Sequence, residues 1–82
     1  MTVRARGELD AGEFEAALRS GYAGANGPML IDLTGVTYFS MEDAWVLVDF
    51  RLAHATTRLL LRVSSVVERK LATLGVAELF SL

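Results

Sequence analysis

Three short stretches with strand character alternate with longer segments of helical periodicity, and this alternation most restricts what the chain can fold into. The strand-like stretches lie at residues 2–6, 29–33 and 58–63, and a helical pattern follows each of them. Strands that alternate with helices pair in parallel through right-handed crossovers. We therefore expect an α/β domain of the order β-α-β-α-β-α, built on a small, mostly parallel sheet.

The three strands are expected to differ in burial. Residues 2–6 alternate apolar side chains with arginines, which suits a strand with one solvated face that ends at Gly7. Residues 29–33 and 58–63 are almost continuously apolar, as in strands that are buried on both faces of a parallel sheet. Thr34 and Gly35 are expected to turn the chain after the second strand.

Capping signals predict where the helices begin. Asp10 with Glu13 predicts the start of the first helix, and Ser40 with Asp43 predicts the start of the second, which should run to about Ala55. The first helix has one apolar face and should end in the glycine-rich segment 24–28. The residues of this apolar face are Phe14, Ala17, Leu18, Gly21 and Tyr22.

The last third of the chain predicts one more helix. Ser65 with Glu68 should cap it, and Gly75 should close it. Its apolar positions are Val67, Leu71 and Leu74. The apolar tail 76–80 is expected to dock as a final helical turn.

The second helix is apolar on two nearly opposite sides, which is unusual in a two-layer domain. Ala44, Val48, Leu52 and Ala55 share one side, and Val46, Phe50 and Ala53 share the other. One side must therefore point away from the sheet. It either forms a contact surface for another chain or is covered by the C-terminal segment.

Composition limits the function. Eighty-two residues make a single domain, 1–82, and the absence of Cys excludes disulfides and thiolate metal sites. A net charge of −2 disfavours direct nucleic-acid binding. No signal peptide is evident, and no apolar run approaches the roughly 20 residues of a membrane span. We expect a cytoplasmic protein that does not insert into membranes.

Catalytic and cofactor motifs are not recognisable. His54 lies late in a helix without a nucleophile nearby, and the glycines between residues 21 and 27 lack the preceding strand and the lysine of a nucleotide-binding loop. The acidic residues between 8 and 15 are those that a helix start and an exposed helix face usually carry. We therefore expect neither an enzyme nor a bound metal or cofactor.

Three segments resemble the STAS domain, the anti-sigma-factor-antagonist fold of bacterial regulatory proteins. They are Gly7-Glu8-Leu9-Asp10, Ile31-Asp32-Leu33-Thr34-Gly35-Val36, and the stretch from Leu71 to Phe80 with its Gly75-Val76 and Leu79-Phe80 pairs. The resemblance covers nearly the whole chain and implies a STAS-like sheet with helices packed mainly on one side. We expect the family's usual first strand to be missing from this chain. The edge at residues 2–6 would then invite pairing into a homo-oligomer, unless Arg4 and Arg6 keep it solvated.

In the STAS family, an Asp-Ser-Ser-Gly sequence at the start of the second helix carries the serine that an anti-sigma kinase phosphorylates. The resemblance places this sequence on Ser40-Met41-Glu42-Asp43, so that Glu42 stands at the phosphoserine position. Glu42 is either an ordinary residue of a helix first turn, a fixed charge that imitates phosphoserine, or part of a diverged interaction surface. Ser40 is either the helix N-cap or a displaced phosphoacceptor.

The resemblance implies an anti-sigma-factor-antagonist-like domain in bacterial partner switching. Such a domain would bind an anti-sigma factor or a serine kinase. Asp10 is expected both to cap its helix and to face the partner, while Met41, Asp43 and Trp45 replace small family residues and make the surface bulkier. The expected partner-binding residues are Asp10, Ser40, Met41, Glu42, Asp43 and Trp45. One alternative is a non-phosphorylated scaffold or regulatory subunit of a transporter ATPase or a sensory complex, and another is a homo-oligomerising module.

Overall fold

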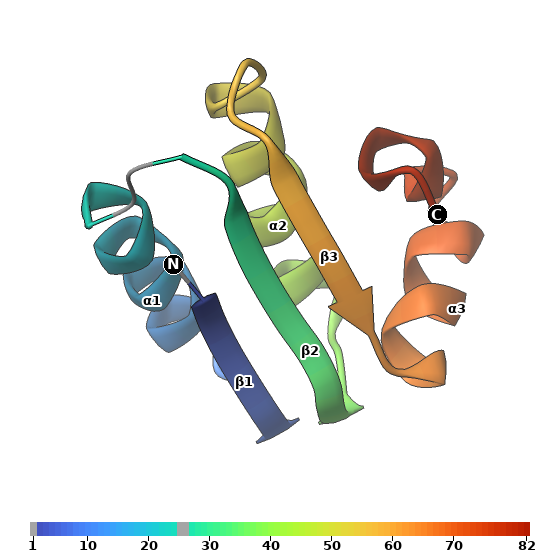
Figure 1. Ribbon diagram of the computed structural model, residues 1–82. Helices are drawn as coiled ribbons and strands as arrows, with labels where there is room; N and C mark the ends of the chain where they lie inside the picture. The colour runs from blue at the N-terminus through green and yellow to red at the C-terminus, as the bar shows by residue number, and fades with distance from the viewer. Residues whose placement is uncertain (1, 25–26) are drawn as a thin grey trace.

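The expected alternation of strands and helices is present in the computed structural model, which describes residues 2–24 and 27–82. Helices and strands follow one another in the predicted order, and the chain finishes in a short 3-10 helix, η1 (Figure 1). The elements are β1 (Thr2–Glu8), α1 (Ala11–Ala23), β2 (Met29–Tyr38), α2 (Met41–Ala53), β3 (Leu59–Val63), α3 (Ser65–Thr73) and η1 (Ala77–Phe80).

The sheet has three strands in the order β1-β2-β3, and both pairings are parallel. The predicted parallel sheet is thus confirmed. The register aligns Arg4, Asp32 and Arg62 across the three strands. Pairing between β2 and β3 is regular, whereas pairing between β1 and β2 shifts twice, between Arg4 and Arg6 and between Gly7 and Glu8.

One face of the sheet packs against helices, and the other is open. In Figure 1, α1 and α2 lie behind the sheet, while α3 and η1 lie beyond β3. The core between these layers consists of buried apolar side chains from the sheet and from all three α-helices. Its buried members are Val3, Phe14, Leu18, Met29, Ile31, Leu33, Val36, Phe39, Ala44, Leu47, Phe50, Val67 and Leu71.

The second strand differs from the prediction in both length and burial. It continues through Thr34 and Gly35 to Tyr38, so the predicted turn is wrong, and an extra residue of β2 is accommodated between Asp32 and Gly35. Burial alternates along the strand, because only one of its faces has helices over it. The prediction of a strand buried on both faces is therefore wrong.

The third strand is also less buried than predicted. It begins at Leu59, and no residue within it is fully buried; Leu60 is 50% exposed on the open face. The first strand extends through Gly7, whose φ of 73° lies in the left-handed region that glycine adopts without strain.

The two apolar sides of α2 are covered by different elements. Ala44 and Val48 are buried, and the opposite side, with Phe50, packs against α1, where Tyr22 and Phe50 form an edge-to-face pair at 6.0 Å. α3 and η1 also contact α2, so the C-terminal segment lies against this helix, as one of the two alternatives expected. Leu52, at 60% exposure, is left uncovered.

The N-caps of α1 and α2 are the predicted residues, whereas the N-cap of α3 lies one residue earlier than predicted. Asp10 and Ser40 are the N-caps of α1 and α2, whereas Ser64, not Ser65, caps α3 and accepts a hydrogen bond from the N–H of Val67. The second helix ends at Ala53 rather than at about Ala55. Of the predicted break at 24–28, Ala25 and Asn26 lie outside the described residues.

Two features predicted for the C-terminal part of the chain are present in the structure. Gly75 follows α3 with a φ of 73°, as expected for a glycine that terminates a helix. The tail forms η1, whose Ala77 and Phe80 pack against the core, so the docked helical turn is confirmed. Within the described part of the chain, no helix combines the length and apolar character that crossing a membrane requires.

Replacing Leu33 tests how strongly the central strand holds the domain together. Leu33 is completely buried, so Leu33→Ala should lower the free energy of unfolding by about 2–5 kcal/mol. Urea denaturation followed by circular dichroism measures this loss. Leu52→Ala, on the exposed side of α2, is the matched control and should cost about 0.5 kcal/mol or less. Equal losses in the two variants would contradict the assignment of the core.

The side chain of Asp32 stabilises the irregular part of β2 on the open face of the sheet. Its Oδ1 accepts hydrogen bonds from the N–H and the hydroxyl of Thr34, at 3.0 and 2.7 Å, and Arg4 Nε lies 3.2 Å from its Oδ2. These hydrogen bonds to Thr34, and secondarily the Arg4 guanidinium, hold the pKa of Asp32 below its ordinary value of 3.8.

The lowered pKa makes a pH-dependent contribution to stability. Because the folded state favours the carboxylate, the contribution of Asp32 is complete above the unfolded-state pKa and is lost as the pH falls through the lower folded-state value. The stability difference between the native protein and Asp32→Asn should thus be largest between about pH 5 and 7 and shrink below about pH 4. Urea denaturation across this pH range tests it, and a difference that grows on acidification would contradict it.

Candidate functional site

All three α-helices begin at one end of the sheet, the end to which the strand arrows point in Figure 1. Parallel strands bring their carboxyl ends, and the loops that follow them, to a common edge. The loop between β1 and α1 carries Asp10, and the loop between β2 and α2 carries Ser40. The topology therefore places the residues predicted for partner binding on two neighbouring loops and on the first turns of α2.

A reciprocal pair of hydrogen bonds fixes the start of α2. Ser40 Oγ accepts the N–H of Asp43 at 3.0 Å, and Asp43 Oδ2 accepts the N–H of Ser40 at 2.9 Å. This is a complete capping box, in which each side chain satisfies a backbone N–H that the helix leaves free. The Ser40 hydroxyl is thus engaged, and the N-cap role predicted for it is confirmed.

Asp43 occupies a different environment from its neighbours in the predicted site. It has no exposed surface, and its Oδ1 lacks a hydrogen-bond partner among the described residues. A side chain in this position fixes the geometry of the loop and would not touch a partner unless the loop moved. Its effect on binding would pass through Ser40 and the first turn of α2.

Three residues of the first turns of α2 point to solvent, and we call them the α2-start surface: Met41, Glu42 and Trp45. Met41 is 54% and Trp45 is 43% exposed, and their spacing of four residues places them on one side of the helix. Glu42, exposed between them in sequence, adds one carboxylate. The surface combines a large apolar area with a single negative charge, a combination suited to contact with another protein.

The loop of Asp10 is tied to that of Ser40 through aromatic packing. Asp10 caps α1, because its Oδ1 accepts a hydrogen bond from the N–H of Glu13 at 3.0 Å. Asp10 itself is exposed. Phe14 of α1 and Phe39 of the second loop, each 2% exposed, meet edge to face with ring centroids 6.5 Å apart. This pair connects the first turn of α1 with the loop before α2.

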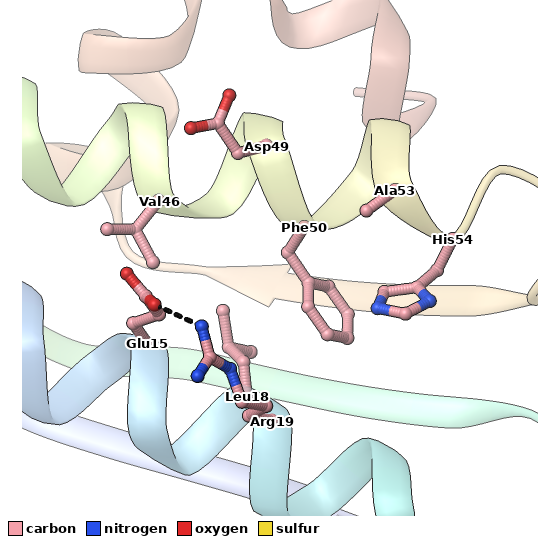
Figure 2. A pocket seen from close by; sticks show the side chains of 8 residues that line it. All are labelled: Glu15, Leu18, Arg19, Val46, Asp49, Phe50, Ala53 and His54. Atoms are coloured by element: carbon pink, nitrogen blue, oxygen red, sulfur yellow. Dashed lines mark hydrogen bonds and ion pairs between the residues drawn. The ribbon is translucent and has the colours of Figure 1, made fainter.

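A groove between α1 and α2 was not predicted from the sequence (Figure 2). It has a volume of about 260 Å³ and an apolar floor that includes Leu18, Val46 and Phe50. Glu15 and Arg19 form an ion pair on its α1 side, with 2.6 Å between Oε1 and Nη2. The second apolar side of α2, with Val46 and Phe50, was the signal in the sequence that could have indicated it.

His54 closes this groove at the end of α2 opposite to Ser40. Its ring stacks on Tyr22 with centroids 3.8 Å apart and lies 4.6 Å from the ring of Phe50. The histidine thus packs within an aromatic cluster. In residues 2–24 and 27–82, no three His, Cys, Asp or Glu side chains are grouped so that they could hold a metal ion.

Comparisons with protein-family models, with curated proteins and with solved structures gave no match.

The capping box can be tested as a coupled unit. Ser40→Ala should lower the free energy of unfolding by about 1 kcal/mol, because the N–H of Asp43 loses its acceptor. Asp43→Ala removes the opposite hydrogen bond, so the double variant should cost less than the sum of the two single changes. Urea denaturation of the four proteins gives the coupling. Strict additivity would contradict the reciprocal pair, and Ser20→Ala, exposed on α1, serves as the neutral control.

Proposed function

We propose that the chain is an anti-sigma-factor-antagonist-like STAS domain that binds an anti-sigma factor or a serine kinase of the partner-switching type. The observation that best supports this proposal is the α2-start surface, where the large apolar side chains of Met41 and Trp45 are exposed beside Glu42. Aromatic residues such as tryptophan are frequent among the residues that dominate binding energy in protein interfaces. In this proposal the domain acts in the cytoplasm, is not an enzyme, and affects transcription only through its partner.

The geometry favours binding without phosphorylation of Ser40. Its hydroxyl accepts a hydrogen bond from the N–H of Asp43 at the helix start, and a phosphate attached there would disturb the capping box. Glu42 supplies a permanent negative charge near the partly positive start of α2, where phosphoserine would supply a reversible one. We infer that Glu42 holds the domain in a fixed state that resembles the phosphorylated one.

The engaged Ser40 also supports a second candidate function. A STAS-like scaffold or regulatory subunit of a transporter ATPase or a sensory complex would need no phosphorylation. This scaffold or subunit would bind its partner through the same α2-start surface. Asp10 would lie at the border of the surface, and Ser40 and Asp43 would fix the helix start that carries it. The two functions therefore differ in the protein that is bound and not in the residues that bind it.

Partner capture with matched variants separates these functions. The tagged protein, Trp45→Ala and Leu52→Ala are used to retain proteins from an extract of cells that produce the chain, and retained proteins are identified by mass spectrometry. Trp45 and Leu52 are both exposed apolar residues of α2, but only Trp45 belongs to the α2-start surface. We expect an anti-sigma factor or a serine kinase, retained by Leu52→Ala and weakened by about 30-fold in Trp45→Ala, equivalent to ~2 kcal/mol.

Two results would contradict the leading proposal. Retention of a transporter or sensory-complex component, lost in Trp45→Ala, would establish the scaffold function instead. Equal retention by Trp45→Ala and the native protein would show that the partner binds elsewhere. For the captured partner, Glu42→Ser should raise the affinity while Glu42→Asp, which keeps the charge, should leave it nearly unchanged; identical affinities of both variants would exclude a role for this charge.

A further inference from the structure

Two rows of side chains on the open face of the sheet differ in chemistry. Val3 and Ile31 are buried on the helix side, so the even-numbered residues next to them point to the open side. The register of the three strands aligns these residues into rows about 7 Å apart. In Figure 1 this face is towards the viewer, and none of the described helices lies in front of it. The leucine row consists of Thr2, Leu30 and Leu60, and the arginine row consists of Arg4, Asp32 and Arg62.

The arginine row can bind carboxylates of another molecule. Asp32 accepts a hydrogen bond from Arg4 Nε, but the side chain of Arg4 stays 71% exposed. Arg62 is exposed and forms no ion pair with the described residues. Two strand spacings separate the two arginines, which places their Cα atoms about 10 Å apart. A guanidinium has five N–H donors, so both arginines keep donors for further acceptors.

The exposed side of α2 carries a matching pair of lines. At about 100° per residue, Met41 and Trp45 share an apolar line along the helix. Glu42 and Asp49 share an acidic line beside it. All four residues are exposed, whereas Leu47, on the opposite side of α2, is completely buried. The α2-start surface thus continues to Asp49 and combines apolar with negatively charged side chains.

The spacings on the helix agree with those on the sheet. Glu42 and Asp49 lie about 10 Å apart along the helix axis, which is also the distance between the two ends of the arginine row. Met41 and Trp45 lie about 6 Å apart along the axis, close to the spacing of about 5 Å between the two leucines on neighbouring strands. One surface of the chain is therefore complementary to the other in charge, apolar character and dimensions.

We propose that copies of the chain associate head to tail, with the exposed side of α2 from one copy on the open sheet face of the next. The helix crosses the strands, so that its acidic line lies over the arginine row and its apolar line lies over the leucine row. Because the helix is right-handed, both matches occur together only when it runs from β3 towards β1. Glu42 then faces Arg62 of the next copy, and Asp49 faces Arg4.

A second copy fits this sheet face better than a nucleic acid does. Neither row contains an aromatic ring on which a base could stack, and a phosphate backbone would leave the leucines without apolar contact. The two complementary surfaces lie on different sides of one copy, so each copy can bind two others. Such an interface does not close after two copies, and the assembly grows with concentration.

Head-to-tail association would also regulate the α2-start surface. Glu42 and Trp45 belong to both interfaces, so a copy bound at α2 excludes the partner proposed for that surface. Association would thereby lower the fraction of chains that can bind the partner. This consequence rests on the proposed function, whereas the association itself does not.

Charge reversal on either surface tests the association. Sedimentation equilibrium of the purified native protein from about 1 to about 500 µM should give a mean mass that rises beyond that of a dimer. Arg62→Glu and Glu42→Arg each set like charges opposite one another and should each weaken association about tenfold or more. An equimolar mixture of the two variants should recover association, because the reversed charges match again. Arg69→Glu, exposed on α3, is the matched control and should associate as the native protein does. Circular dichroism verifies that each variant is folded.

Three results would overturn the proposal. The first is a native protein that stays monomeric over the whole range. The second is native-like association of Arg62→Glu or of Glu42→Arg, since one of the two surfaces would then be unused. The third is a mixture of these variants that associates no better than either one alone, which would reject the pairing of Glu42 with Arg62.

Partner capture is measured separately, so that the two proposals can fail independently. Arg62→Glu leaves the α2-start surface unchanged and should retain at least as much partner as the native protein. A loss of partner in Arg62→Glu would contradict the exclusion of the partner by a second copy. Capture of no partner by any variant would count against the proposed function and leave the association standing.

Discussion

Burial of one face of β2 is the constraint on which the rest of the domain depends. Met29, Ile31 and Leu33 have no exposed surface, and they lie beneath the helices that follow β1 and β2. A domain of this size buries only about 60 to 65% of the surface of its unfolded chain, so there is little apolar surface to spare. The helices must therefore lie close to the sheet. Gly21 of α1 permits this, since a Cβ there would collide with Val3.

The same layer arrangement determines where function can be sought. Helices on one side leave three surfaces for other molecules: the open face of the sheet, its β1 edge, and the end at which the helices begin. The open face is tied together by the ion pair between Arg4 and Asp32. The helix-start end exposes Met41 and Trp45. The proposed partner therefore approaches the end at which the helices begin.

The sequence was sufficient to predict features governed by local chemistry. The N-caps Asp10 and Ser40 and the glycine after α3 follow from backbone groups that need a partner within a few residues, and the docked tail follows from its apolar composition. Features that depend on distant segments were predicted less well. Thr34 and Gly35 have the composition of a turn, but pairing with β1 keeps them in the strand, while the side chain of Asp32 satisfies the N–H of Thr34.

Burial and the groove between α1 and α2 could not be predicted for the same reason. An apolar run such as 59–61 does not reveal whether one or two layers will cover it. The candidate site was located by resemblance, whereas the burial of Asp43 became evident only from the packing.

The order of the strands also has a consequence for how the chain folds during synthesis. Each strand pairs only with the strand next along the chain, so β1, α1 and β2 form a closed unit before β3 is needed. Contacts between segments close in sequence favour rapid folding. A nascent chain that has emerged as far as Tyr38 already contains both strands of the first pair, and each later helix can add to a sheet that exists. The last strand to join, β3, is also the one against which α3 and η1 pack once they have formed.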